Sequence, residues 1–399
     1  MDPIYLDNNA TTRVFPEVVQ EMLPFFTEQF GNASSIHAFG EEVGSAMRTA
    51  RRAVQALIGA EHDHEIIFTS GGTESNNAAI RSALAANPAR NELITSAVEH
   101  PAILSLADWL EKHEGVVVHR IPVDGKGRLD IDAYRAALGP KTALVSFMWA
   151  NNETGTIFPV DGLADLAHDA GALFHTDAVQ AAGKVPIDLK STEIDMLSLS
   201  SHKLHGPKGL GALYLRKGTR FRPLLRGGHQ ERGRRGGTEN APAIIGLGKA
   251  AEMTLATMAQ DLPRIEALRN RLENGIVQKV GHCFITGDTR DRLPNTSTIA
   301  FEYIEGEAIL MLLNKQGIAA SSGSACTSGS LEPSHVLRAM DIPFTAAHGA
   351  IRFSLSRETT EAEIDRVIDA VPAIIDQLRD MSPFWSTEGG VAAFNPEYA

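Results

Sequence analysis

The chain is short of cysteine, of long apolar runs and of positive charge, and each shortage excludes a class of protein. Two cysteines, Cys283 and Cys326, in 399 residues rule out a disulfide framework and a self-contained site with four cysteine ligands. No stretch approaches the roughly 20 apolar residues that a membrane-spanning helix requires. The formal net charge of −12 argues against nucleic acid as the main partner, because binding to phosphates needs a basic surface.

The remaining composition is that of an ordinary globular protein. Hydrophobic residues make up 43% and charged residues 22%, and 399 residues are enough for two domains. Asp2 and Asp7 stand where a signal peptide would carry positive charge, so we expect a cytoplasmic protein with no membrane partner. The basic, glycine-rich segment 226–235 is a local exception: it is either a solvated loop or a loop that faces an anion or a second subunit.

Short apolar segments alternate with helical segments from about residue 46 onwards. The apolar segments are too short and too continuously apolar for strands with one wet face. They predict strands of a mainly parallel sheet that helices cover on both sides. The helical segments between them, such as 46–58, 101–112 and 163–170, would supply the crossovers. The strand segments are 66–69, 93–95, 116–119, 143–147, 172–174, 196–199 and 212–215.

The pattern changes near residue 255. We expect a large domain of residues 14–256 and a smaller α/β domain of residues 1–13 and 257–399, with a poorly patterned tail from about Pro383. The elements expected in the smaller domain are a helix at 262–279, a strand at 298–301, a helix at 306–315, a Gly/Ser-rich loop, a strand at 351–355 and a helix at 360–379.

Lys203 stands in the segment Ser200-Ser-His-Lys-Leu-His-Gly-Pro-Lys-Gly209, directly after a predicted strand. A lysine at the end of a strand is usually a solvated surface residue. Here hydroxyls, histidines and glycines surround it, which suggests a backbone wrapped closely around a ligand. A lysine that attacks a carbonyl group must be deprotonated, and a partly desolvated site lowers its pKa. Lys203 is therefore a candidate nucleophile.

Asp177 ends another predicted strand, 26 residues before Lys203. A buried carboxylate needs a partner, and the protonated ring nitrogen of pyridoxal phosphate is one that also makes the ring an electron sink. The alternative is a helix cap after the strand, which the spacing to Lys203 weakens.

Two further segments suit the same cofactor. Residues 67–74, Ile-Phe-Thr-Ser-Gly-Gly-Thr-Glu, form a strand, a glycine turn and the start of a helix, where backbone N–H groups would meet a phosphate. A plain strand-to-helix turn would look alike. His100, between a strand and a helix, could stack on a flat ring and move protons near neutral pH, although an isolated histidine is more often structural.

The chain resembles the cysteine desulfurases of the class V aminotransferase group, and among them most closely the nitrogen-fixation type. The resemblance covers nearly the whole chain. It implies a fold-type I pyridoxal-phosphate transferase of the α/β class, with a large domain built on a mainly parallel seven-stranded sheet and a smaller α/β domain that carries the catalytic cysteine loop at about 321–334. The motifs that carry it are Tyr5-Leu-Asp-Asn-Asn-Ala-Thr-Thr12, Phe30-Gly-Asn32, Asn151-Asn-Glu-Thr-Gly155, Ser201-His-Lys203, Gly237-Thr-Glu-Asn240, the segment 321–334 and Ile351-Arg-Phe-Ser-Leu355.

The resemblance also implies roles. Lys203 would hold the cofactor covalently, and Arg352 would bind the substrate carboxylate with its planar fork, with Asn152 beside it. In a homodimer, Thr238 would reach the cofactor phosphate of the partner subunit. Family members often have alanine or another small residue at the position of Gly72. The implied cofactor-binding residues are Gly72, Thr73, Ser200, His202 and Thr238 at the phosphate end, Asn152 and Gln180 near the ring hydroxyl, Asp177 on the ring nitrogen, His100 on the ring face and Lys203.

The two cysteines differ in their surroundings. Cys283 lies in an apolar, strand-like segment, which predicts a buried and inert thiol. Cys326 lies between Gly/Ser-rich arms that favour flexibility and exposure, although an incidental loop cysteine would look similar. In the implied reaction, Lys203 and His100 would move protons while Cys326 takes the sulfur of L-cysteine as a persulfide and leaves alanine. An arm of about 6 residues extends about 20 Å, enough to carry that sulfur out of a cleft.

The leading hypothesis is therefore a cysteine desulfurase that passes sulfur to a scaffold protein for iron–sulfur cluster assembly, with nitrogenase maturation as the favoured pathway. No resident metal is expected, and a transient contact between Cys326 and a nascent cluster stays open. A housekeeping desulfurase would use the same residues. A transaminase or another lyase would keep Lys203, Asp177 and Arg352 but have no use for Cys326. The presence of all four residues disfavours a non-catalytic docking scaffold.

Overall fold

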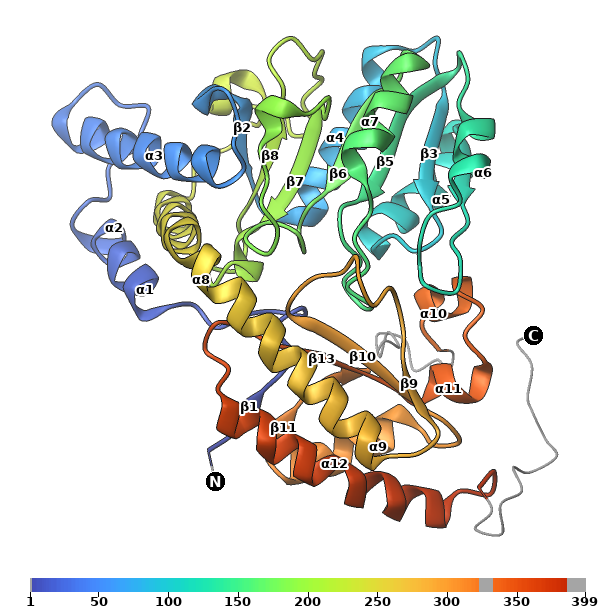
Figure 1. The fold of residues 1–399 in the computed structure, drawn as a ribbon. Helices are drawn as coiled ribbons and strands as arrows, with labels where there is room; N and C mark the ends of the chain where they lie inside the picture. The colour runs from blue at the N-terminus through green and yellow to red at the C-terminus, as the bar shows by residue number, and fades with distance from the viewer. Residues whose placement is uncertain (1, 323–332, 386–399) are drawn as a thin grey trace.

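The computed structural model describes residues 2–322 and 333–385, and Cys326 lies outside these ranges. Two α/β units are stacked, the larger at the top of Figure 1 and the smaller below it. In the described part of the chain, no helix is both long and apolar enough to cross a membrane.

The larger unit is built on a seven-stranded sheet in the order β2-β8-β7-β6-β5-β3-β4. The strands β7, β6, β5, β3 and β4 pair in parallel. Strand β8 is antiparallel to both of its neighbours, β2 and β7. All seven strand segments expected from the sequence are present. Their bounds are β2 Ile66–Thr69, β3 Glu92–Ser96, β4 Val117–Ile121, β5 Thr142–Met148, β6 Leu173–Asp177, β7 Met196–Ser200 and β8 Gly211–Leu215.

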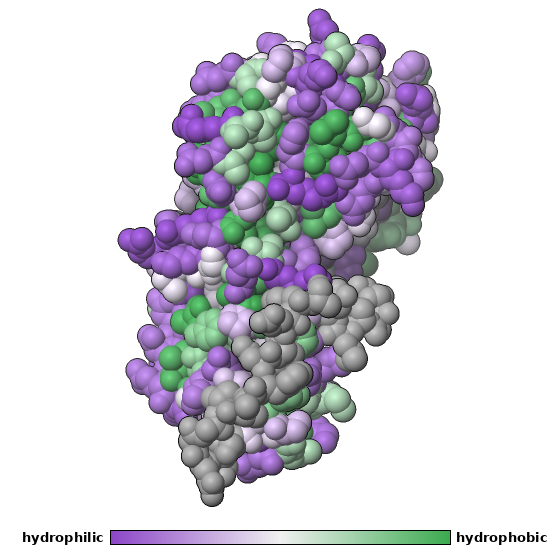
Figure 2. Space-filling view, turned by 90° about the vertical axis from the view of Figure 1, so that its right-hand side faces the viewer, coloured by the Kyte–Doolittle hydropathy of each residue, from purple (hydrophilic) through white to green (hydrophobic). Residues whose placement is uncertain are grey.

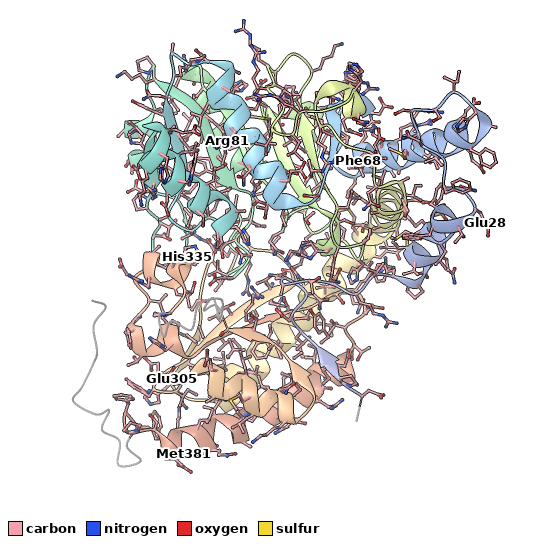
Figure 3. All side chains as sticks on the ribbon, turned by 180° about the vertical axis from the view of Figure 1, so that it is seen from behind. Glu28, Phe68, Arg81, Glu305, His335 and Met381 are labelled. Atoms are coloured by element: carbon pink, nitrogen blue, oxygen red, sulfur yellow. The ribbon has the colours of Figure 1, made fainter. Side chains whose placement is uncertain are left out.

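Helices cover both faces of this sheet, which explains why its strands are apolar without alternation. Helix α7 lies on one face, and helices α4 and α5 lie on the other (Figures 1 and 3). Polar side chains predominate on the outer surface of this unit in the face that Figure 2 shows. The helix bounds are α3 Ala38–Leu57, α4 Gly72–Ala86, α5 Pro101–Glu114, α6 Ile131–Ala137 and α7 Val160–Asp169.

The smaller unit contains a four-stranded antiparallel sheet in the order β12-β13-β10-β9. The first residues of the chain join it, because β1 pairs in parallel with β11. The bounds are β1 Ile4–Tyr5, β9 Cys283–Ile285, β10 Thr296–Phe301, α9 Gly306–Lys315, β11 Ile318–Ala319, β12 Ser321–Ser322, α10 His335–Ala339, α11 Phe344–His348, β13 Ala350–Ser354 and α12 Glu361–Met381.

One long helix, α8 (Ala241–Lys279), runs through both units (Figure 1). Its first half packs on α3, and its second half packs on α12. The helix expected at 262–279 is only this second half, so the sequence underestimated its length by 21 residues. The apolar residues of the second half, with Ile4 and Leu6, form a separate core in the smaller unit. This separate core supports our proposed division of the chain near residue 256, with α8 crossing the division.

Candidate active site

A cavity opens at the carboxyl ends of parallel strands in the large sheet, where ligands bind in open α/β sheets. It encloses about 780 Å³ of empty space, the open water at its mouth included. The turns that follow β2, β5, β6 and β7 supply much of its lining. Nine of the ten expected cofactor-binding residues line this cavity, and they are Gly72, Thr73, His100, Asn152, Asp177, Gln180, Ser200, His202 and Lys203.

Lys203 ends a single turn of 3₁₀ helix, Ser201–Lys203, that follows β7. Its amine donates hydrogen bonds to the backbone carbonyl oxygens of Asn9 and Ala10, the latter at 2.6 Å. Burial, helped by the positive charge of Arg352, lowers the pKa of this amine to about 8. At pH 7 about one tenth of the side chain is therefore the neutral amine that attack on a carbonyl requires.

Asp177 is buried at the end of β6, and both of its oxygens are held in place. Oδ1 accepts a hydrogen bond of 2.9 Å from the backbone N–H of Val179, and Oδ2 accepts one of 2.6 Å from Nδ2 of Asn76. Asn76 was not predicted as a site residue. It lies three residues after Thr73 in α4, and this spacing on a helix is the signal that could have found it.

The side of the cavity near the start of α4 offers hydrogen-bond donors for an anion. Gly72 and Thr73 open this helix, whose first backbone N–H groups have no partner within the helix. A Cβ atom at Gly72 would lie 2.8 Å from Cγ2 of Val179, so alanine there would require Val179 to shift. Burial lowers the pKa of His202 to about 4, so its imidazole is neutral near pH 7. Its Nδ1 shares a hydrogen bond of 3.1 Å with the hydroxyl of Thr11.

His100 is the N-cap of α5, and its ring is fixed in one orientation by the backbone. Its Nδ1 accepts a hydrogen bond of 3.1 Å from the N–H of Ala102, which leaves the hydrogen of a neutral ring on Nε2. Burial lowers the pKa of His100, and the charge of Asp177 partly opposes this effect. The cavity is thus lined by a neutral imidazole that can donate a hydrogen bond.

Arg352 lies on β13, beside the cavity rather than in its lining. Its Nη2 forms an ion pair of 2.8 Å with Oδ1 of Asp7, and its Nη1 donates to the backbone carbonyl of Asn152 at 3.1 Å. Its buried Nε has no hydrogen-bond partner among the described residues. Asp7 was not assigned a role, although it stands inside one of the motifs that carry the resemblance.

Among the described residues, a second expected site residue besides Arg352 does not line the cavity. Thr238 is exposed next to the start of α8 and lines a different cavity, together with Phe68 and Arg235. Cys326 lies outside the described residues.

The basic segment 226–235 is not simply solvated, because its Arg235 forms a half-buried ion pair of 2.9 Å with Glu74 of α4.

Cys283, the other cysteine, lies on β9 and is half-buried rather than fully buried. Its thiol donates a hydrogen bond of 3.1 Å to the carbonyl of Val280. Burial raises the pKa of the thiol. It therefore stays protonated and unreactive near neutral pH.

The arrangement suits pyridoxal phosphate. A fixed carboxylate can pair with the ring nitrogen, a partly neutral amine can attach the aldehyde, and a helix start with nearby hydroxyls can hold the phosphate. The chain belongs to the aminotransferase class-V family, whose model matches residues 4–367. Members of this family depend on pyridoxal phosphate, so the cofactor predicted from the sequence is confirmed.

Two bacterial relatives of this chain share one activity. The chain is 68% identical to a cysteine desulfurase of Gluconacetobacter diazotrophicus and 67% identical to the cysteine desulfurase NifS of Azotobacter vinelandii, in both cases over 100% of each chain. A solved structure described as a NifS-like protein covers 94% of this chain and 100% of its own, with 37% identity and a TM-score of 0.88. These relatives confirm the fold-type I architecture and the cysteine desulfurase activity that the sequence predicted.

Proposed function

We propose that this enzyme transfers the sulfur of L-cysteine to Cys326 and so supplies sulfur for iron–sulfur cluster assembly. The observation that carries the proposal is the convergence of Lys203, Asp177 and His100 on one cavity, in a chain similar over its full length to cysteine desulfurases. When bound, pyridoxal phosphate supplies an electron sink that makes the bonds at the α-carbon of an amino acid labile.

Asp177 would hold the ring nitrogen of the cofactor. Its carboxylate is aimed by Asn76 and by the N–H of Val179, so it needs little rearrangement to accept a hydrogen bond from that nitrogen. Gln180 and Asn152 would face the ring hydroxyl, and Thr73, Ser200 and His202 would hold the phosphate. A carboxylate beside the ring nitrogen favours its protonated form, which is the form that withdraws electrons.

Lys203 and His100 would move the protons of the reaction. The Lys203 amine has a pKa of about 8, close enough to neutrality to take a proton from the α-carbon and return it later. His100 can donate from Nε2, because its Nδ1 is occupied by the backbone. Both side chains line the same cavity, so one substrate can be reached by the two groups.

Arg352 would bind the substrate carboxylate. Its guanidinium presents a planar set of donors that matches a carboxylate, and its buried Nε has no partner within residues 2–322 and 333–385. The ion pair with Asp7 and the bond to Asn152 fix the orientation of this group.

Cys326 would receive the sulfur. Its thiolate attacks the sulfur of the substrate, so that an S–S bond forms and the bond between the substrate's Cβ and sulfur breaks. The electron pair of the broken bond stays on the carbon side, which takes up a proton and becomes alanine. Strand β12 ends at Ser322, four residues before Cys326 in the sequence, and it lies next to Arg352 in the sheet, because Ser321 pairs with Arg352.

The other end of this segment also lies at the active site. The hydroxyl of Ser334 donates to the buried carboxylate of Glu153, which is the neighbour of Asn152. Nε2 of His335 donates a hydrogen bond of 2.9 Å to the carbonyl of Glu99, the neighbour of His100. Figure 3 shows His335 where the smaller unit meets the larger one. Both flanks of the cysteine segment therefore support a role for Cys326 at this cavity.

The proposal predicts one added sulfur atom on one peptide. After exposure of the purified enzyme to L-cysteine, mass spectrometry is expected to find a persulfide on the peptide that contains Cys326, together with an equal amount of alanine. The peptide that contains Cys283 serves as the internal control and is expected to stay unmodified. Added sulfur on the Cys283 peptide alone would contradict the assignment.

We also propose a homodimer in which Thr238 completes the site of the partner. Five large apolar side chains between α1 (Pro16–Met22) and the start of α3 are exposed, on the side at the left of Figure 1. They are Leu23 (56%), Phe26 (61%), Phe30 (68%), Ile36 (102%) and Phe39 (56%). An apolar surface of this kind marks a protein interface. The exposure of Thr238 outside the cavity of its own chain agrees with a contact to another subunit.

Mixed dimers provide the test. The enzyme is expected to have a mass about twice the 42.9 kDa of one chain. A Thr238→Val dimer should hold the cofactor more weakly than the unmodified dimer. A mixed dimer of Thr238→Val and Lys203→Ala chains should regain one intact site, because Lys203 of one chain then meets Thr238 of the other. A mixed dimer no better than Thr238→Val alone would show that Thr238 does not act across the interface.

For the sulfur acceptor we propose an iron–sulfur scaffold protein, with nitrogenase maturation as the pathway. The support is the 67% identity to the NifS protein of Azotobacter vinelandii over the full length of both chains. A housekeeping pathway of cluster assembly remains the alternative, since it would use the same residues. The cytoplasmic location expected from the sequence stays a prediction.

A further inference from the structure

We infer that Lys184 is a positioning residue that holds the side-chain amide of Gln180 with its NH₂ group toward the cofactor cavity. The inference rests on the proposed function, in which Gln180 faces the ring hydroxyl of the cofactor. Lys184 itself does not line that cavity but lies behind Gln180, where it lines a neighbouring cavity between the two units.

The hydrogen bonds of Gln180 allow only one orientation of its amide. Nζ of Lys184 donates to Oε1 of Gln180 at 2.7 Å, and Nε2 of Gln180 donates to the backbone carbonyl of Asn9 at 2.9 Å. A protonated lysine has no acceptor and a carbonyl has no donor, so a flipped amide beside the charged Lys184 would lose both bonds. Nε2 has a second hydrogen, and Gln180 lines the cofactor cavity.

The local backbone places Lys184 behind Gln180. The chain turns after β6, with hydrogen bonds from Ala182 N to Ala178 O and from Val185 N to Ala181 O. Gly183 has a left-handed φ of 72°, and a Cβ there would lie 2.6 Å from Cγ2 of Thr254. Lys184 lies four positions after Gln180 in this non-helical turn, and the turn brings their side chains into hydrogen-bond contact.

The surroundings of Lys184 are unfavourable for an ordinary surface lysine. Burial, with smaller effects from Lys203 and Arg352, lowers the pKa of its amine to about 7. The amine also lies 3.4 Å from Oδ1 of Asn9, a side chain that Asn295 holds through a bond of 3.0 Å. Burial removes water from the Lys184 amine, which costs free energy. The hydrogen bonds to Gln180 and Asn9 offset part of this cost.

The orientation of Gln180 matters for the charge on the ring oxygen. An N–H group directed at that oxygen stabilises its ionised form, whereas a carbonyl oxygen in the same place would repel it. Loss of Lys184 frees the Gln180 amide to rotate. The pKa of the bound cofactor should then rise. The pH midpoint of the change in its visible absorption band should rise with it.

The test is a pH titration of this visible band in the purified holoenzyme. Lys184→Met is expected to raise the midpoint by about 0.5 to 1 pH unit, as is Gln180→Ala. The double variant should show no larger shift than Gln180→Ala alone, because Lys184 acts through Gln180. Lys184→Arg keeps a hydrogen-bond donor, so its midpoint should stay within about 0.2 pH unit of that of the unmodified enzyme. Lys190→Met removes a lysine from an exposed position and should leave the midpoint unchanged.

Several results would overturn the inference. They are an unchanged midpoint in Lys184→Met, a shift in the double variant equal to the sum of the single shifts, and an unmoved midpoint in Gln180→Ala. If Lys184→Met does not fold, the arginine variant decides, since a shift in it as large as that of Gln180→Ala also overturns the inference. An unmodified enzyme that shows no visible band with the cofactor would contradict the proposed function itself.

Discussion

Replacing Cys326 with alanine is expected to lower the release of sulfane sulfur from L-cysteine below about 1% of the unmodified rate. The variant should keep its yellow cofactor and still change colour when cysteine is added, because Lys203, Asp177 and Arg352 are untouched. The physical reason is that the broken bond needs a nucleophile to accept the sulfur, and no other described thiol is near the cavity. Alanine and sulfide formation are the measurements.

Cys283→Ala is the matched control for this experiment. It removes the same group from a half-buried strand position whose thiol has a raised pKa, and the enzyme should keep nearly all of its activity. Thermal melting of both variants would separate loss of chemistry from loss of fold. Undiminished alanine production in Cys326→Ala would refute the role of Cys326 as sulfur acceptor.

Replacing Lys203 with alanine is expected to lower activity by more than about 1,000-fold. The variant loses both the covalent attachment of the cofactor and the proposed base. Reversible binding should persist, because Asp177 and the residues around Thr73 remain in place. Borohydride reduction followed by mass spectrometry should place the cofactor on the Lys203 peptide of the unmodified enzyme and on no peptide of the variant. A variant with unchanged activity would remove Lys203 from the mechanism.

The lowered pKa of Lys203 adds a pH dependence to this result. Only the neutral amine attaches the cofactor, and its fraction rises with pH until it levels off above the pKa of about 8. Attachment to the apo-protein should therefore accelerate about tenfold per pH unit below 8 and then reach a plateau. A rate that still rises between pH 9 and about 10.4, the ordinary lysine value, would contradict the lowered pKa. Lys203→Arg, which stays charged, should show no attachment at any of these pH values.

The sequence predicted the sheet better than the long helix. All strands of the large sheet except the edge strand β4 are buried on both faces, so each is a short apolar run that differs clearly from its surroundings. The helix expected at 306–315 coincides with α9. The first half of α8 was missed because glycines interrupt its pattern. Gly248 lies against α3 so closely that a Cβ there would be 2.5 Å from Cα of Ala50. Glycine weakens a helix prediction from sequence, but here it permits close packing of two helices.

The sequence also named most of the lining of the cavity but few of its supports. Lys203 and Asp177 stand at the ends of apolar runs, which is a local signal. Asn76 lies one helical turn after Thr73, a spacing that could have found it, whereas Lys184 follows Gln180 in a non-helical turn and is recognised only in the folded chain. Asp7 meets Arg352 across 345 residues of sequence, and no local pattern reveals such a pair.

The pairing register of β12 with β13 relates two proposed functions, the binding of the substrate and the transfer of its sulfur. Ser321 and Ser322 pair with Arg352 and Ile351, and the chain continues from Ser322 directly toward Cys326. Arg352, proposed to recognise the substrate, and the two residues that precede the cysteine segment thus belong to one ladder of hydrogen bonds. A slip of one residue reverses the face of the sheet that each side chain of a strand occupies. A shifted β12 would therefore change where the cysteine segment begins relative to Arg352, even if every other residue stayed in place. The pairing of β12 with β13 would therefore set where the cysteine segment begins relative to the proposed substrate site.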